Sequence, residues 1–223
     1  MLKSKILDEI GRRHGTDKCG TIKDGHDYLR KYEFFLSPLR NESFTFLELG
    51  IFKGASLKTW AEYFPQAEIV GVDIEEKTKI HEGGRVKVII GDLSQTDFLE
   101  TLPALGPRVI IDDASHWWAD QLRALFVLFP KLAGGGIYIV EDLQTSFEPL
   151  APLFSAGIPY RPFDVLLKIA EYMTGNERPA PVRPDENLRP ISRAEVFHEE
   201  IRYIADHCDA LTFIERACIL VKK

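Results

Sequence analysis

Cysteine is scarce in this chain of 223 residues. The three cysteines, Cys19, Cys208 and Cys218, stand far apart in the sequence. They show neither the close spacing of a metal site nor the even number of a disulfide framework. This sparse use of cysteine favours a reducing compartment, so we expect a cytoplasmic protein.

Long uninterrupted hydrophobic runs are lacking as well. Residues 1–13 mix charged and apolar side chains, without the apolar segment or cleavage site of a signal peptide. The apolar stretch over residues 122–140 is interrupted by Arg123, Pro130, Lys131 and three glycines, which makes it too broken to cross a bilayer. We therefore expect no membrane anchor and no membrane partner.

An excess of positive charge is also missing. The 28 basic residues and 34 acidic residues give a formal net charge of −6, and the basic residues are scattered along the chain. This balance argues against binding to a nucleic-acid backbone. With 45% hydrophobic residues, the chain is long enough for one domain with one sizeable core.

From residue 44 onward, short apolar runs alternate regularly with amphipathic segments. This alternation predicts βαβ units that form a mainly parallel sheet. The expected strands, rich in Val, Ile, Leu and Phe, are Phe44–Leu49, Glu68–Val72, Val86–Ile90, Val109–Asp112 and Ile137–Glu141. The clearest helix is expected from about His116 to Leu132, where three glycines follow it.

The C-terminal residues 197–223 carry further strand-like runs with no crossover helix between them. These runs are Ile201–Ile204, Leu211–Ile214 and Cys218–Val221. We interpret them as an antiparallel pair at one edge of the sheet. The expected fold class is therefore α/β: a Rossmann-like, mainly parallel sheet of seven strands with helices on both faces.

Two regions do not follow the alternating pattern: one precedes the predicted core domain of residues 41–223, and the other is inserted in it. Residues 1–40 are expected to form a helical cap segment, with two helices around a glycine-rich turn. Within the core domain, an insertion over residues 144–194 holds eight of the 13 prolines and one predicted helix, Pro162–Met173. Long irregular insertions of this kind commonly form lids or binding loops.

The run Glu48-Leu49-Gly50-Ile51-Phe52-Lys53-Gly54 joins the first strand to a helix. Gly50 and Gly54 allow the backbone to approach a ligand closely. The run lacks the G-x-G-x-x-G pattern of dinucleotide sites, and Glu48 would repel a pyrophosphate. A sulfonium cofactor with an ammonium group suits this strand end better.

Acidic residues also end the second and third strands. Asp73 is placed to accept hydrogen bonds from both hydroxyls of a ribose, and Asp92 to hold an adenine amino group. Alone, Asp92 is equally suited to capping a helix. Together these strand ends predict binding of S-adenosylmethionine, with Ser56 as a further contact and Asp112 just outside direct contact.

The fourth strand ends in Asp112-Asp113-Ala114-Ser115-His116, and the fifth in Glu141-Asp142. Ligands of open α/β sheets bind at this edge, and clustered carboxylates repel each other unless a cation neutralises them. Hard oxygen ligands select Mg²⁺, Ca²⁺ or Mn²⁺ over zinc. We assign magnesium, or another divalent cation, to Asp113, Glu141 and Asp142.

His116 follows Asp113 by three residues, so a helix that began there would turn both side chains to one side. A neutral imidazole beside a metal is suited to take the proton of a hydroxyl group during methyl transfer. Two other interpretations remain open. Asp113 or Ser115 would serve as a helix cap with His116 on the surface, and Trp117 would pack against a helix instead of lining a pocket.

These residues resemble a known family, the metal-dependent sugar O-methyltransferases of macrolide and related natural-product pathways (the mycinamicin methyltransferase type), within the class I methyltransferases. The matching residues are Gly15-Thr16-Asp17-Lys18, His26, Tyr28, Tyr32, the loop from Glu48 to Gly54, Asp73, the Asp-Asp-x-Ser-His run at 112–116, Gln121 and Glu141-Asp142. The match covers most of the chain. Ala114 stands where relatives frequently have glycine.

The resemblance implies the same three metal ligands, with His116 as general base. It also implies that the segment from Gly15 to Tyr32 folds over the ligands. Lys18 and Tyr28 would then contact the cofactor, whereas His26 and Tyr32 would contact the acceptor. Independently of the resemblance, Trp117 is a further candidate for the acceptor pocket because it follows His116. The acceptor would be a small molecule, in particular a glycoside, and a homo-oligomer is a further expectation because relatives often assemble.

Three alternatives stay open from the sequence. A catechol or another phenol would also chelate magnesium through vicinal oxygens. An NAD(P)-dependent oxidoreductase fits the general α/β pattern, but the glycine fingerprint and a Tyr-x-x-x-Lys pair are missing. A module that binds S-adenosylmethionine without catalysis would bind the cofactor but no metal.

Overall fold

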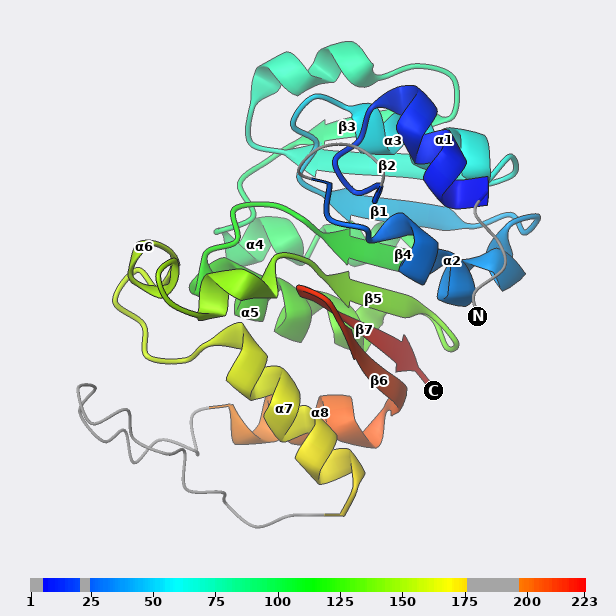
Figure 1. Ribbon diagram of the computed structural model, residues 1–223. Helices are drawn as coiled ribbons and strands as arrows, with labels where there is room; N and C mark the ends of the chain where they lie inside the picture. Colours follow the sequence, from blue (N-terminus) through cyan, green and yellow to red (C-terminus); the bar gives the residue numbers. More distant parts are fainter. Residues whose placement is uncertain (1–5, 21–24, 176–196) are drawn as a thin grey trace.

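The computed structural model describes residues 6–20, 25–175 and 197–223, which fold around one seven-stranded sheet (Figure 1). The order across the sheet is β3-β2-β1-β4-β5-β7-β6; β7 pairs antiparallel with both β5 and β6, and the other neighbouring pairs are parallel. The strands are β1 (Thr45–Leu49), β2 (Glu68–Asp73), β3 (Val86–Ile90), β4 (Pro107–Asp112), β5 (Ile137–Val140), β6 (Cys208–Ile214) and β7 (Ala217–Lys222). The predicted fold class is confirmed.

Helices cover both faces of this sheet. The α-helices are α1 (Ile6–His14), α2 (Leu29–Leu36), α3 (Ala55–Tyr63), α4 (Thr96–Leu99), α5 (Trp118–Leu128), α6 (Ala151–Phe154), α7 (Pro162–Met173) and α8 (His198–Asp206). Short 3-10 helices are η1 (Ser37–Leu39), η2 (Glu76–His81), η3 (Leu102–Leu105), η4 (Phe129–Lys131) and η5 (Leu143–Ser146). Among the described helices, none has the length and apolar character needed to span a membrane.

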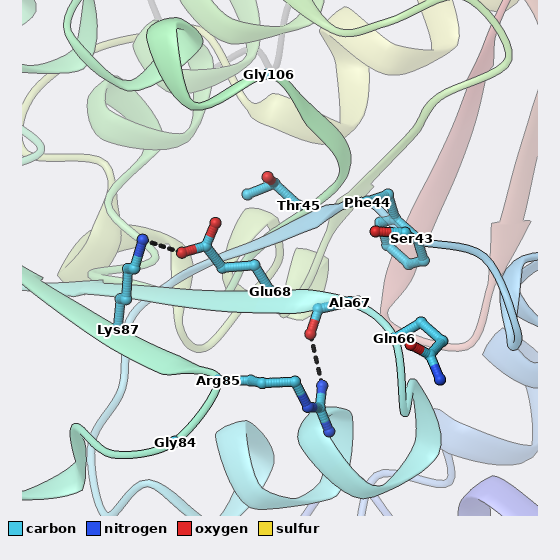
Figure 2. Close-up of a pocket in the computed structure, with 10 residues that line it drawn as sticks. All are labelled: Ser43, Phe44, Thr45, Gln66, Ala67, Glu68, Gly84, Arg85, Lys87 and Gly106. Carbon is cyan, nitrogen blue, oxygen red and sulfur yellow. Dashed lines mark hydrogen bonds and ion pairs between the residues drawn. The ribbon is translucent and has the colours of Figure 1, made fainter.

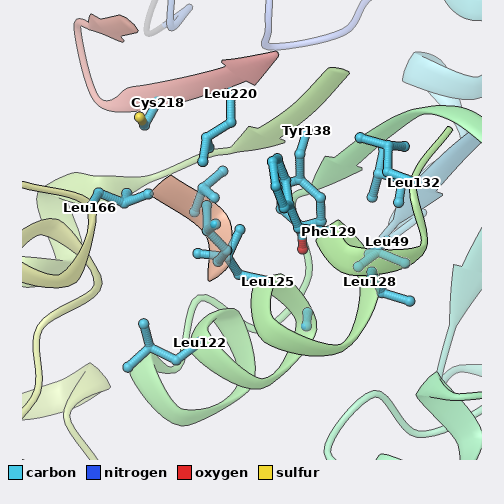
Figure 3. Packing of buried hydrophobic residues seen from close by; sticks show 14 of the residues in the cluster. Leu49, Leu122, Leu125, Leu128, Phe129, Leu132, Tyr138, Leu166, Cys218 and Leu220 are labelled. Atoms are coloured by element: carbon cyan, nitrogen blue, oxygen red, sulfur yellow. The ribbon is translucent and has the colours of Figure 1, made fainter. Parts of the chain in front are cut away.

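The two faces of the sheet bury separate apolar clusters because side chains alternate along each strand. On one face, β-strand residues such as Phe46 pack against Trp60 of α3 and the apolar sides of α1 and α2. On the other, Leu125 and Leu128 of α5 pack against strand residues such as Tyr138 (Figure 3). Helices α7 and α8 extend this second cluster.

One strand prediction is wrong. The run Ile201–Ile204 lies in helix α8, where Ile201, Ile204 and Ala205 are buried. These positions have the spacing of one helix face, and a short apolar run does not distinguish a strand from a helix by itself. The antiparallel pair is β6 and β7, as the two later runs predict.

The predicted helix over residues 116–132 begins later than expected. Helix α5 starts at Trp118, and His116 precedes it with a positive φ of 58°. The premise that His116 and Asp113 share a helix is therefore wrong. Their side chains nevertheless meet: each offers a ligand atom within 4.8 Å of the other.

The insertion over residues 144–194 lies partly outside the described residues, which end at Gly175 and resume at Phe197. Its predicted helix is α7, with the bounds expected. Val165, Leu166 and Ile169 of this helix are buried in the cluster under α5. Helix α7 thus covers the sheet, and a lid role for the rest of the insertion stays a prediction.

A depression of 470 Å³ lies at the amino edge of the sheet, opposite the predicted site (Figure 2). Its charged side chains are already paired within the protein. Lys87 forms an ion pair with Glu68, and the Arg85 guanidinium donates hydrogen bonds to the carbonyls of Phe64 and Ala67. This hollow therefore offers no unsatisfied charge to a ligand.

Candidate functional site

The loops after β1 and β4 approach each other closely at the carboxyl edge of the sheet. Gly50 has a φ of 92°, and a Cβ atom there would lie 2.2 Å from the backbone oxygen of Asp113. The amide of Gly50 donates to the Val72 carbonyl at 2.8 Å, and the amide of Asp113 donates to the Leu49 carbonyl at 2.9 Å. Glycine is required at position 50 because any side chain would separate the two loops.

Asp73 at the end of β2 fixes the loop that follows Gly50. Its Oδ2 accepts hydrogen bonds from the amides of Ile51 and Phe52 at 2.8 and 3.2 Å. Phe52 and the neighbouring Ile74 are 75% and 63% exposed. The edge expected to bind the cofactor thus has two exposed apolar side chains beside a carboxylate that holds the loop through hydrogen bonds. A contact of Asp73 with a ribose stays a prediction.

Glu48 lies deeper than a direct cofactor contact would require. It is fully buried, and its carboxylate accepts hydrogen bonds from Ser56 Oγ at 2.8 Å and Trp60 Nε1 at 3.1 Å. Burial raises the pKa of Glu48 to about 7. In this conformation Glu48 and Ser56 bind each other at the base of α3.

Two more residues of the predicted cofactor site, Asp92 and Asp112, also interact with the protein itself. Asp92 Oδ1 accepts the amide of Ser94 at 2.9 Å in the loop before α4, and no side chain caps α4, so the helix-cap alternative is wrong. Hydrogen bonds from the side chain and the amide of Ser94 lower the pKa of Asp92, and its contact with an adenine stays a prediction. Asp112 is buried on the α5 face beside Tyr138, and one of its carboxylate oxygens has no hydrogen-bond partner among the described residues. Burial raises the pKa of Asp112 to about 8, which favours its neutral form.

Three potential metal ligands converge at the ends of β4 and β5. Asp113, His116 and Asp142 each offer an atom, and these atoms lie within 4.8 Å of one another. His116 Nε2 lies 3.2 Å from Asp142 Oδ2. Both residues have a positive φ, 58° and 56°, a conformation that non-glycine residues adopt rarely and that recurs at functional sites.

Glu141, the third predicted metal ligand, is held by the N-terminal segment. Its carboxylate accepts a hydrogen bond from Lys18 Nζ at 2.6 Å and one from the Tyr32 hydroxyl at 3.0 Å. Lys18 also binds Asp113. Burial alone would lower the pKa of Lys18, but the charges of Asp113 and Glu141 raise it well above its ordinary value.

Asp142 receives two further side chains of the same segment. The Tyr28 hydroxyl donates to Asp142 Oδ1 at 2.8 Å, and His26 Nδ1 lies 3.7 Å from that oxygen. Burial works against ionisation of Asp142, yet His116 and the hydrogen bonds it accepts lower its pKa. Asp142 is therefore an anion that the protein surrounds with donors.

All four side chains of this segment that are predicted to bind ligands, Lys18, His26, Tyr28 and Tyr32, thus lie against the acidic residues of the site. The sequence-based interpretation missed these contacts. It also missed His81, whose ring packs so closely on Gly54 that a Cβ there would lie 2.5 Å away. Trp117 is 50% exposed just before α5, which suits either a pocket wall or surface packing.

Comparison with known proteins supplies a second line of evidence. The chain is 40% identical over 152 residues to the 8-demethyl-8-alpha-L-rhamnosyl tetracenomycin-C 2'-O-methyltransferase of Streptomyces olivaceus, a match that covers 64% of this chain and 39% of the relative. It is 32% identical over 152 residues to the mycinamicin VI 2''-O-methyltransferase of Micromonospora griseorubida, covering 64% of this chain and 37% of the relative. No family model matches the sequence.

The solved structure of MycE methyltransferase from the mycinamycin biosynthetic pathway, in complex with Mg and SAH, superposes with a TM-score of 0.78 at 25% identity. The alignment covers 99% of this chain and 54% of MycE. The fold is that of a class I methyltransferase. The chain resembles sugar O-methyltransferases of natural-product pathways, although it spans less than two fifths of these curated relatives and about half of MycE.

Proposed function

We propose that the protein is an S-adenosylmethionine-dependent O-methyltransferase that methylates a sugar hydroxyl of a glycosylated small molecule with the help of a divalent metal. The observation that carries this proposal is the meeting of Asp113, His116 and Asp142 at the carboxyl edge of the sheet. The names of its relatives give a rhamnosyl tetracenomycin and a mycinamicin as their acceptors. The reducing cytoplasm expected from the cysteines suits such an enzyme.

The residues of the site fit a divalent metal by their chemistry. Asp113 and Asp142 offer carboxylate oxygens within 4.8 Å of each other, and carboxylate oxygens favour Mg²⁺ or Mn²⁺. Glu141 lies directly beside Asp142 in sequence and shares Lys18 with Asp113. We therefore retain Asp113, Glu141 and Asp142 as the metal ligands and His116 as the general base.

The cofactor site fits S-adenosylmethionine in the same manner. Phe52 and Ile74 present apolar surface beside the ends of β1 and β2, where the adenosine would lie. Asp73 stands at the same edge. The first turn of α3, which begins after Gly54, leaves backbone amides for the carboxylate of the cofactor.

When bound, S-adenosylmethionine would supply the methyl group, and a divalent metal held by Asp113, Glu141 and Asp142 would stabilise the developing negative charge of the acceptor oxygen. His116 Nε2, beside Asp142, accepts the proton of the hydroxyl group. His116 has a φ of 58°, and its Nε2 lies 3.2 Å from Asp142 Oδ2. Asp142 orients this ring, and the donors from Tyr28 and His26 hold Asp142 in place.

The proposal is tested by titrating Mg²⁺ into the protein saturated with S-adenosylhomocysteine and by measuring turnover on rhamnosyl glycosides. Asp113→Asn should abolish metal binding, whereas Asp97→Asn, an exposed carboxylate of α4, should leave it unchanged. His116→Asn should lower turnover by about a hundredfold or more while the affinity for S-adenosylhomocysteine is kept.

Each result has a distinct meaning. Absence of metal binding in the wild-type protein would refute the metal-dependent mechanism. Full turnover by His116→Asn would remove His116 as the base. Metal binding with methyl transfer to catechols, but to no glycoside, would replace the sugar by a phenolic acceptor.

A further inference from the structure

The side chain of Lys18 lies in the middle of the acidic site. It is 2% exposed, and its Nζ donates to Asp113 Oδ2 and, at 2.6 Å, to Glu141 Oε2. Glu48 Oε1 lies 4.0 Å from the same nitrogen. One ammonium group therefore contacts two of the three carboxylates that we assign to the metal.

The turn that carries Lys18 is fastened to the protein independently of this ammonium group. The Lys18 carbonyl accepts the amide of Tyr28 at 2.8 Å. The hydroxyls of Tyr28 and Tyr32 bind Asp142 and Glu141. Because these contacts hold the backbone, the long and flexible side chain of Lys18 is able to move while the turn stays in place.

An ammonium group and a divalent cation cannot share the same carboxylates at contact distance. Repulsion between like charges is strong in a buried site, where water does not screen it. Equally, the carboxylates of Asp113 and Glu141 would repel each other if neither cation were present. The site therefore needs one cation or the other.

We propose that Lys18 is a built-in counter-cation: its ammonium group occupies Asp113 and Glu141 in the metal-free protein, and a divalent ion must displace it in order to bind. This inference rests on the proposed metal-dependent function. It assigns Lys18 to control of metal affinity, in place of the cofactor contact that the sequence predicts. The N-terminal segment thereby takes part in the exchange of the metal.

The experiment compares Mg²⁺ binding by calorimetry, with S-adenosylhomocysteine present, in the wild type, Lys18→Met and Lys31→Met. Lys31 is a matched control because it lies in the same segment and is ion-paired at 3.3 Å with Asp27 and Glu215, away from the site. Lys18→Met should bind Mg²⁺ about tenfold more tightly or better, because no ammonium has to leave. Lys31→Met should bind like the wild type.

The outcomes separate the inference from the function on which it rests. Equal or weaker Mg²⁺ binding by Lys18→Met, with binding by the wild type intact, would overturn the displacement and leave the proposed function standing. Absence of Mg²⁺ binding in all three proteins would overturn both.

Folding of the variant gives an independent measurement. Lys18→Met leaves buried carboxylates without their cation, so its unfolding temperature without metal should fall. Mg²⁺ should then raise the unfolding temperature of Lys18→Met more than that of the wild type. An equal or smaller rise would contradict the exchange of Lys18 for the metal.

Discussion

The close approach of the β1 and β4 loops makes Gly50→Ala a sharp test of the site geometry. The new Cβ would lie 2.2 Å from the oxygen and 2.8 Å from the carbon of the Asp113 carbonyl. These are backbone atoms, which cannot rotate away as a side chain can. The substitution must therefore either separate the loops or strain both.

The expected loss of unfolding free energy in Gly50→Ala has two parts, and the same substitution at a second glycine measures one of them alone. A side chain at a φ of 92° costs about 1–2 kcal/mol from backbone strain alone. The collision adds about 1–3 kcal/mol, as overpacking of a core does. Gly84 has a φ of 57° with no atom within 4 Å of its Cβ position, so Gly84→Ala carries only the first part.

Urea unfolding measures both variants against the wild type. We expect Gly50→Ala to lower the free energy of unfolding by about 2–5 kcal/mol and Gly84→Ala by about 1–2 kcal/mol. Gly50→Ala should also weaken metal binding, because it displaces Asp113, whereas Gly84→Ala should not. If both substitutions cost the same, the close approach of the two loops is refuted.

Two further predictions concern buried polar groups. Because the pKa of Asp112 is raised from 3.8 to about 8 in the folded protein, the folded state holds this proton more tightly than the unfolded chain. The free energy of unfolding should therefore fall as the pH rises between these values. In Asp112→Asn, unfolded by urea without metal at about pH 5 and about pH 8, this decrease should be much smaller. An unchanged pH dependence would contradict the raised pKa of Asp112. Tyr32→Phe removes the hydroxyl that donates to Glu141 at 3.0 Å and should cost about 1–3 kcal/mol of unfolding free energy, and a loss below the error of the measurement would show that another donor replaces it.

The sheet was predictable from sequence because each buried strand is a short run of Val, Ile or Leu between amphipathic segments. Strand β3 has the bounds that the pattern predicts, Val86–Ile90. The run Ile201–Ile204 failed because four residues are too few to separate a strand from a helix with two buried isoleucines. Residues 201–204 form part of a helix that packs against α7, and this tertiary contact cannot be read from the local sequence pattern.

The convergence of Asp113, His116 and Asp142 was predictable from topology alone. Parallel strands β4 and β5 are neighbours, so the residues that follow them meet at one edge. The partners of these residues were not predictable in the same way. Lys18 is 95 residues from Asp113 and 123 from Glu141, and no periodicity relates positions so distant.

These distant partners make the N-terminal segment a part of the acidic site. The acidic edge needs donors and positive charge as soon as it is buried, with or without a metal. Lys18, Tyr28 and Tyr32 supply them, and each binds a carboxylate at the end of β4 or β5. The predicted boundary near residue 40 therefore separates a helical segment from the sheet in the sequence. In the site, however, side chains from both sides of this boundary bind each other through charges and hydrogen bonds.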